Sequence, residues 1–392
     1  MTQIDACDPC LRRTNLLSLL STRIERAGRG RATFGRLLAL SDDDLISAMG
    51  ADHDARLHLA RGRFVPDAER ERCAARDVGA ICRHAAGYPA RLLELDDPPA
   101  MLHVAGDPSA LAAVCARHGD VPAIAVVGAR RATTYALEVA RMLGRDLAHA
   151  DVSVVSGMAL GVDSAAHEGA LAGGGRTIAV LAGGADVIYP RSKHRLYHRI
   201  RANGCAVSEL PPGAEVMRWA FPARNRLIAA LAAAVVVVEG RDRSGSLITA
   251  DIAADLGRPV GAVPGLVTAP RSAGTNALLA DGAAVIRDAR DALDLAALPP
   301  RRPRVGPRRE PVPVPSPPRP PVPPPDPELE PALREALAAV DDGADSPDRL
   351  AVVLGGDVAA ATIALTRLEL VGVLRRELDG SYARRVRRRG AG

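Results

Sequence analysis

The chain has 392 residues, 47% hydrophobic and 25% charged, so it can bury more than one core and is not a disordered polymer as a whole. Only 2% of the residues are aromatic, so Ala, Val and Leu must build those cores. The 51 Lys and Arg exceed the 46 Asp and Glu by a formal charge of +5. A surplus of that size permits nucleic-acid binding but does not indicate it.

The sequence shows no charged-then-apolar leader, and no apolar run approaches the ~20 residues of a membrane span, so we expect a cytoplasmic protein without a membrane partner. Six cysteines are too few for a disulfide scaffold. Cys7 and Cys10 form a C-x-x-C, whereas Cys73 and Cys82 precede His84 at a looser spacing. A structural zinc site typically has a second closely spaced pair of ligand residues, which is not visible here. We therefore expect ordinary thiols and no metal, with zinc as the alternative.

Residues 1–82 carry leucines at helical spacing between Gly- and Asp-rich breaks, which predicts a small helical module. From about residue 100 to 295, short Val/Ile/Ala runs alternate with amphipathic stretches such as 135–148 and 192–202. Apolar runs without alternation are typical of strands buried on both faces. We therefore predict a Rossmann-like, doubly wound, mostly parallel α/β domain over 83–297. Its predicted strands are 124–127, 152–155, 177–181, 206–208, 234–238, 260–263 and 284–286.

Proline dominates residues 298–330, which predicts an extended linker. The tail, 331–392, has three helical segments, the second opening with Ser346 at the cap and Pro347 in the first turn. Two short strand segments joined by Asp379-Gly380 follow them. Helices plus a hairpin predict a winged-helix domain, whose partner is either DNA or protein. A basic tail ends the chain, since the last nineteen residues hold seven Arg and two acids.

Small residues follow several predicted strands, where ligands bind in a parallel sheet. Backbone N–H groups at such turns, and the helix N-termini behind them, attract anions. Arginines, an amide and hydroxyls stand beside these turns, so the sequence predicts a phosphate-binding pocket. The candidate residues are Gly128, Arg130, Ser156, Gly157, Lys193, Arg224, Asn225, Arg226, Ser244 and Gly245.

Two nucleotide-binding motifs are absent from the sequence. No G-x-G-x-x-G follows the first strand of the series and no acidic residue ends the second, which disfavours a dinucleotide cofactor; no G-x-x-x-x-G-K-S/T loop occurs either. His167 lies near Asp163 in the sequence, but it is surrounded by alanines, so we interpret it as a packing or capping residue. We expect a binding protein without cofactor or catalytic residues, not an enzyme.

Seven segments in this order resemble the DNA-processing protein A family (DprA, also called Smf). They are VVGARRATTYA, SGMALGVDSAAHEGAL, LAGGADVIYP, SELPPG, FPARNRLIAALA, VVVVEGRDRSGSLITADIAADLGRPVGAVPG and GTNALLADGAAVI. The resemblance covers residues 79–288. It implies a Rossmann-like domain that binds single-stranded DNA, dimerises, and loads the recombinase RecA during natural transformation.

The resemblance also assigns site residues. Arg130 matches the family's G-S-R arginine, Ser156-Gly157 its S-G turn, and Arg224-Asn225-Arg226 its F-P-x-R-N-R. Ser244-Gly245 matches its S-G-S loop, and Lys193 lies after Y-P, where the family tends to carry basic residues facing DNA. These positions are therefore expected to contact the strand.

The sequence departs from the family pattern at four positions. Ala129 replaces the usual serine of G-S-R, and Leu160 stands where the family has an arginine. Ala230 and Ala232 replace the usual Gly and Ser after R-N-R. The loss of an arginine at 160 removes one expected phosphate partner. Two other functions remain open from the sequence: a nucleotide-processing enzyme of a related Rossmann-like fold, and a winged-helix transcription regulator.

Overall fold

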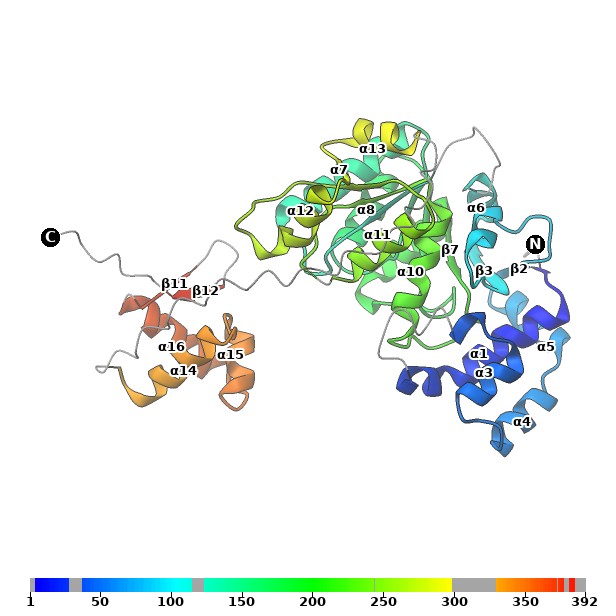
Figure 1. The fold of residues 1–392 in the computed structure, drawn as a ribbon, viewed down its shortest axis with the longest axis horizontal. Helices are drawn as coiled ribbons and strands as arrows, with labels where there is room; N and C mark the ends of the chain where they lie inside the picture. The colour runs from blue at the N-terminus through cyan, green and yellow to red at the C-terminus, as the bar shows by residue number, and fades with distance from the viewer. Residues whose placement is uncertain are drawn as a thin grey trace. The chain divides into compact units, whose positions relative to one another are not determined.

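The structure, a computed structural model, describes residues 4–27, 37–114, 123–242, 244–297, 329–371, 373–376 and 381–384. The chain divides into two compact units, Met1–Val305 and Gly306–Gly392 (Figure 1). Apart from residues 329 and 330, the predicted proline-rich linker lies outside the described residues, as does the basic tail beyond Arg384.

One sheet of ten strands forms the centre of the first unit, in the order β1-β2-β3-β7-β6-β5-β4-β8-β9-β10. Only β3 runs against its neighbours, β2 and β7; the other pairs are parallel. The strands are β1 (Ile4–Asp5), β2 (Gly79–Cys82), β3 (Met101–Gly106), β4 (Ile124–Val127), β5 (Val154–Ser156), β6 (Thr177–Val180), β7 (Cys205–Ser208), β8 (Ala234–Val237), β9 (Val260–Ala262) and β10 (Ala284–Val285).

The seven predicted strands are confirmed as β4 to β10, with ends that differ by at most two residues. The predicted helical module, residues 1–82, also contains β1 and β2, which join the sheet, and β3 is a further strand that we did not predict. These three strands extend one edge of the sheet, where the apolar runs are short or interrupted.

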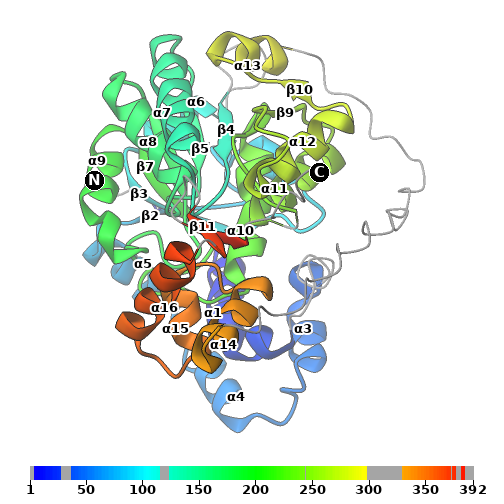
Figure 2. The ribbon, with the colours of Figure 1, turned by 90° about the vertical axis from the view of Figure 1, so that its left-hand side faces the viewer.

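Helices cover both faces of the sheet, as a doubly wound fold requires. In Figure 2, α7 and α8 lie on one side of the strands, and α10 and α11 on the other. The helices of the sheet region are α6 (Pro108–Val114), α7 (Thr134–His149), α8 (Val162–Ala172), α9 (His194–Asn203), α10 (Ala220–Leu231), α11 (Gly245–Asp255), α12 (Ala273–Ala280) and α13 (Ala289–Ala296), with single 3-10 turns at η1 (Ala90–Glu94), η2 (Arg191–Lys193) and η3 (Pro270–Ser272).

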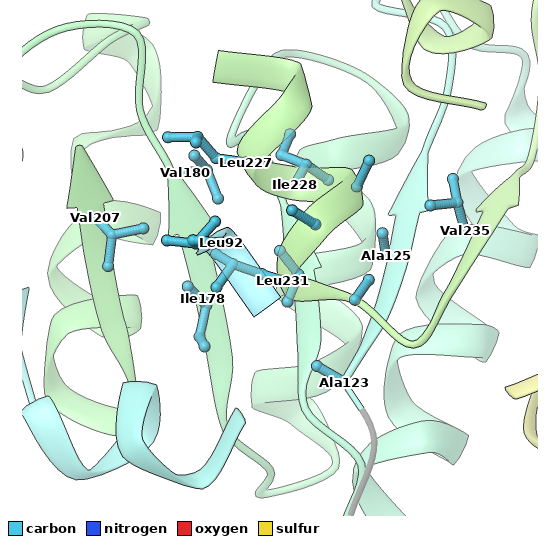
Figure 3. Packing of buried hydrophobic residues seen from close by; sticks show 14 of the residues in the cluster. Leu92, Ala123, Ala125, Ile178, Val180, Val207, Leu227, Ile228, Leu231 and Val235 are labelled. Atoms are coloured by element: carbon cyan, nitrogen blue, oxygen red, sulfur yellow. The ribbon is translucent and has the colours of Figure 1, made fainter. Parts of the chain in front are cut away.

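The core beneath α10 shows why this aromatic-poor sequence folds. Leu227, Ile228 and Leu231 of α10 pack against Val180 and Val207 of the sheet (Figure 3). Alanines of α10 fill the remaining space and let the helix approach the strands closely. Nearly the whole surface of α10 is therefore buried, so its polar side chains must find their hydrogen-bond partners within the protein.

In the described residues before β2 the helices are α1 (Asp8–Ala27), α3 (Asp42–Ala48), α4 (Ala55–Gly62) and α5 (Pro66–Ala75). Leucines of α1, α3 and α4 form a cluster that also contains Trp219 and Ala220, where α10 begins. The backbone N–H of Trp219 donates to Glu25 Oε2 of α1 at 2.8 Å. The N-terminal helices therefore pack against the start of α10.

The second unit contains α14 (Pro331–Asp341), α15 (Pro347–Val353), α16 (Val358–Leu370) and the antiparallel pair β11 (Leu374–Arg376) and β12 (Tyr382–Arg384). These elements match the three helices and two strands that we predicted, and Ser346 is the N-cap of α15. The predicted Asp379-Gly380 connection lies outside the described residues. Within the described ranges, no single helix is both long and apolar enough to cross a bilayer.

Glycines set the close crossing of α7 and α8. A Cβ on Gly144 of α7 would lie 2.2 Å from the Ala166 carbonyl oxygen of α8, and a Cβ on Gly169 of α8 would lie 2.2 Å from the Arg141 carbonyl oxygen of α7. Neither backbone atom can move aside as a flexible side chain would. The two helices therefore pack backbone to backbone.

We predict that Gly144→Ala destabilises the first unit by about 1–3 kcal/mol, because the added methyl group separates α7 from α8. Urea unfolding followed by circular dichroism measures the change. Gly62→Ala in α4 is the matched control, since a Cβ there meets nothing within 4 Å and alanine favours the helix. Equal stability of the two variants would contradict the packing argument.

Candidate nucleic-acid interface

The order of the strands reverses between β4 and β8. From β4 the chain proceeds through β5, β6 and β7 on one side, then returns to β8 on the other side. In an open parallel sheet, such a switch point leaves a crevice beyond the carboxyl ends of the strands. The loops that follow β4, β5, β6 and β8 meet at this edge, and they contain most of the residues that the sequence singled out.

Glu239 ties the two strands of the switch point together. This buried residue follows β8, and its carboxylate accepts from the Thr133 N–H at 2.9 Å and from the Thr133 hydroxyl at 2.8 Å. Thr133 is the N-cap of α7. The start of α7 is therefore occupied by a protein carboxylate, and the position of Glu239 directly after an apolar strand was the only sign of it in the sequence.

Arg226 is a buried ion-pair residue, 6% exposed, between two carboxylates. Its Nε lies 2.9 Å from Asp97 Oδ2, and its Nη2 lies 2.7 Å from Glu209 Oε2. Three further bonds go to Glu209 Oε1 and to the carbonyl oxygens of Ala223 and Asp97. All five N–H donors of the guanidinium are thus used by the protein.

Electrostatics agree with this arrangement. Burial acts to lower the pKa of Arg226, but Glu209 and Asp97 outweigh it and raise that pKa above its usual range. Burial also raises the pKa of Asp97, against the opposing effect of Arg226. We expected Arg226 to contact phosphate; the structure instead uses its charge to neutralise two buried carboxylates.

Arg224, two residues earlier on α10, is 5% exposed and extends in another direction. Its guanidinium donates to the Val180 carbonyl and lies 3.9 Å from Asp163 Oδ2. Burial lowers the pKa of Arg224 to about 10, so the side chain stays protonated at neutral pH. Burial raises the pKa of Asp163, while Arg224 opposes that effect.

Gly157 is the residue over which this guanidinium packs. A Cβ on Gly157 would lie 1.9 Å from Arg224 Nη1, so a larger residue there would displace the guanidinium. The Gly157 N–H donates to Asp163 Oδ2 at 3.2 Å. Its neighbour Ser156 is fully buried and donates to the Val126 carbonyl at 2.6 Å. These groups shape the turn after β5 from inside.

Arg130 is the predicted cation that lies on the surface of this edge. Its guanidinium carbon lies 4.6 Å from the centre of the Phe221 ring, and the Phe221 and Tyr189 ring centres are 5.6 Å apart. Tyr189 is 48% exposed. We call Arg130, Phe221 and Tyr189 the surface stack. Tyr189 and Phe221 also line a narrow pocket together with Gly157 and Arg224, so the two rings of the surface stack share this pocket with a buried cation.

A second group of predicted residues lies where α10 and α11 begin. Asn225, between the two buried arginines, donates from Nδ2 to the Gly245 carbonyl at 3.2 Å. Ser244 shares a 2.6 Å hydrogen bond with the Ser246 hydroxyl, and Gly245 is exposed. The structure therefore brings Asn225, Ser244 and Gly245 together at the N-terminus of α11.

The remaining predicted residues have other surroundings. Lys193, at the end of η2, pairs with Glu168 of α8 at 3.0 Å and keeps 26% of its side chain exposed. Gly128 follows β4 and packs under Val162, where a Cβ would lie 2.7 Å from Val162 Cγ2. His167 is fully buried and bonded to Thr177, and burial lowers its pKa to about 3, which confirms a packing role.

We predict that Arg226→Met destabilises the protein by about 3–5 kcal/mol at pH 7, because Asp97 and Glu209 are left buried without their counter-charge. Loss of Arg226 raises the pKa of Asp97 further, and a carboxyl whose folded pKa lies above its unfolded value is stabilised by protonation. The penalty should therefore shrink as the pH falls from 7 to about 5. Urea unfolding at both values measures it.

Arg241→Met is the matched control, since Arg241 is exposed and the same change of side chain there should leave the unfolding midpoint almost unchanged. A penalty at Arg226 that does not change with pH would show that the lost stability comes from packing and not from the two carboxylates.

Comparison with known proteins agrees with this architecture. The model of the family "DNA recombination-mediator protein A" matches residues 79–297. The chain is 51% identical over 172 residues to the putative DNA processing protein DprA of Mycobacterium tuberculosis, a stretch that spans 44% of either chain. It is 37% identical over 231 residues to DNA processing protein DprA of Bacillus subtilis, covering 58% of this chain and 75% of that relative.

A solved structure matches over a longer range. The X-ray structure of DNA processing protein A from Streptococcus pneumoniae aligns with a TM-score of 0.56 at 29% identity, over 73% of this chain and 95% of that one. The family match covers more than half of the chain and includes every residue of the predicted site. The chain therefore belongs to the DNA recombination-mediator protein A family.

Proposed function

We propose that this protein is a non-enzymatic binder of single-stranded DNA that acts in DNA processing during natural transformation or recombination. The observation that carries the proposal is the surface stack, in which the Arg130 guanidinium lies over Phe221 beside half-exposed Tyr189. Single strands expose the faces of their bases, and aromatic rings with a neighbouring cation bind such faces without reading sequence. Family membership and the names of its relatives support the role in DNA processing.

The proposed path of the strand follows the carboxyl edge of the sheet. Arg130 contacts phosphate or stacks with a base, and Phe221 and Tyr189 offer ring faces. Asn225, Ser244 and Gly245 supply an amide, a hydroxyl and backbone N–H groups where α11 begins, which suits a second phosphate. Gly128 allows the close turn that presents Arg130, and Lys193 extends the positive charge toward α9.

The buried residues of the predicted site have a positioning role in this proposal. Ser156, Gly157 and Arg224 hold the turn after β5 against α10, and Arg226 fixes α10 itself through Asp97 and Glu209. Binding strength then depends on a few exposed groups. We expect a salt dependence set by few phosphate contacts and little preference for base sequence.

The resemblance to the family also supplies the partners that we propose. They are the recombinase RecA, which the protein would load onto the strand, and a second copy of the chain in a cytoplasmic homodimer. The second unit is proposed to be a winged-helix domain, because α14, α15, α16 and the β11–β12 pair follow the order of that fold.

A gel shift with labelled oligonucleotides, single-stranded and duplex, tests the function directly. We expect a retarded complex at lower protein concentration with the single strand, because its bases are open to the surface stack. Addition of RecA should convert this complex into a slower one that contains both proteins. A preference for duplex together with no effect of RecA would overturn the proposal and favour a transcription regulator.

We predict that Arg130→Ala weakens single-strand binding about tenfold and lowers the salt slope by ~0.7, the value for one lost phosphate contact on a single strand. Fluorescence anisotropy across a salt series measures both quantities. Arg56→Ala, an equal loss of charge at an exposed position on α4, should bind like the unmodified chain. Equal losses for both variants would mean that only bulk charge matters.

Phe221→Leu provides the contrast within the surface stack. Leucine keeps the apolar packing of this half-buried position against the N-terminal cluster but removes the ring face. The free energy of binding should become less favourable by about 1–3 kcal/mol, as for one lost base stack, while the salt slope stays unchanged. An unchanged affinity would remove Phe221 from the interface.

A further inference from the structure

Four side chains with metal-binding atoms meet at the β1–β2 edge of the sheet, far in sequence from the proposed DNA site. Cys7 directly precedes α1, and Cys10 lies in the first turn of that helix. Cys82 ends β2, and His84 follows two residues later. The three sulfur atoms and a ring nitrogen of His84 all lie within 4.8 Å of one another.

The individual distances are those of a tetrahedral zinc site. The Sγ atoms of Cys7 and Cys10 lie 3.3 and 3.4 Å from His84 Nδ1, and the Sγ atoms of Cys7 and Cys82 are 3.9 Å apart. Zn–S bonds of ~2.3 Å and Zn–N bonds of ~2.0 Å place tetrahedral ligand atoms roughly 3.5–3.8 Å from one another. The three distances given above lie within a few tenths of an ångström of these values, and all four atoms lie within 4.8 Å of one another.

The fold explains how such distant residues come together. β1 pairs with β2 in parallel, with Asp5 opposite Ile81, so the chain just beyond β1 meets the chain just beyond β2. A tight turn follows, in which the Ala85 N–H donates to the Cys82 carbonyl at 2.9 Å, and this turn directs His84 back toward the sulfur atoms.

The chemistry of the ligands selects the metal and its role. Three thiols and one imidazole, without a carboxylate, are a ligand set that zinc prefers, and four protein ligands leave no open position for a substrate. Cys10 and Cys82 are each 2% exposed, whereas His84 is exposed and closes the site from the solvent side.

We propose that Cys7, Cys10, Cys82 and His84 bind one structural zinc ion, which fastens β1 and the start of α1 to the end of β2. This differs from the expectation of ordinary thiols drawn from the sequence, where no second tight pair is visible. The second half of the site is a C-x-H and not a C-x-x-C, and the fold supplies the proximity. Cys73 belongs to another group, with Glu69 and His103, which is completely buried and offers only three ligands.

Metal analysis of the full-length protein, purified without chelator, is the first test. We expect about one zinc ion per chain. Replacement by Co²⁺ in the unmodified protein should give the intense visible ligand-field bands and the near-ultraviolet thiolate charge-transfer bands of a tetrahedral cobalt–thiolate centre. This spectrum requires no substitution, so it tests the site even where a variant fails to fold. Zinc only at background level, together with a cobalt spectrum typical of six oxygen ligands, would overturn the proposal.

Substitutions then assign the ligands. Cys7→Ser and Cys82→Ser should each lose the metal, whereas His84→Cys should retain it, because a fourth thiolate completes a Cys₄ site. Cys205→Ser is the matched control, a buried cysteine on β7 outside the cluster, and should keep its zinc. Zinc that survives Cys7→Ser but disappears with Cys73→Ser would place the ion in the other group and refute the assignment.

Discussion

The buried charges of α10 determine the arrangement around the proposed interface. The helix is covered on almost every side, yet it carries two arginines, and a buried guanidinium is tolerated only where acceptors surround it. Arg226 gathers Asp97 from the segment before β3 and Glu209 from the segment after β7. Arg224 reaches the end of β6 and the Asp163 carboxylate after β5. Four separate parts of the chain are thus positioned by one helix.

The same constraint decides which groups remain available to a ligand. Cations that neutralise buried carboxylates add nothing to the surface potential, so the exposed members, Arg130 above all, carry the interaction. Phe221 lies at the junction of the two sets, since it is a residue of α10 and also the ring over which Arg130 lies. The buried network therefore positions the surface stack through the helix that both share.

Buried strands leave a pattern of apolar residues in the sequence, so their positions could be predicted. The direction in which a side chain points leaves no such pattern, so the partners of the arginines could not be predicted. Strands β4 to β8 are predictable because both of their faces are covered, which makes each an apolar run; β1, with Ile4 and Asp5 alone, carries no such signal. The motif Arg224-Asn225-Arg226 reads as one basic surface. On a helix, however, side chains two residues apart point in directions roughly 160° from each other, so the two arginines could not share one phosphate chain. Their carboxylate partners are distant in sequence and emerge only with the fold.

Helix α1 connects the cluster of Cys7, Cys10, Cys82 and His84 to the start of α10. Cys7 and Cys10 lie at its first end, and Glu25, near its last residue, accepts the Trp219 N–H just before α10 begins. Twenty helical residues span roughly 30 Å, so α1 is long enough to link the β1–β2 edge of the sheet to the helix that bears Phe221. β1 pairs with β2 over only two residues, so this pairing alone attaches the N-terminal end of α1 weakly. Side chains that fasten this end to β2 therefore stabilise the docking of α1, and through α1 they support the position of α10.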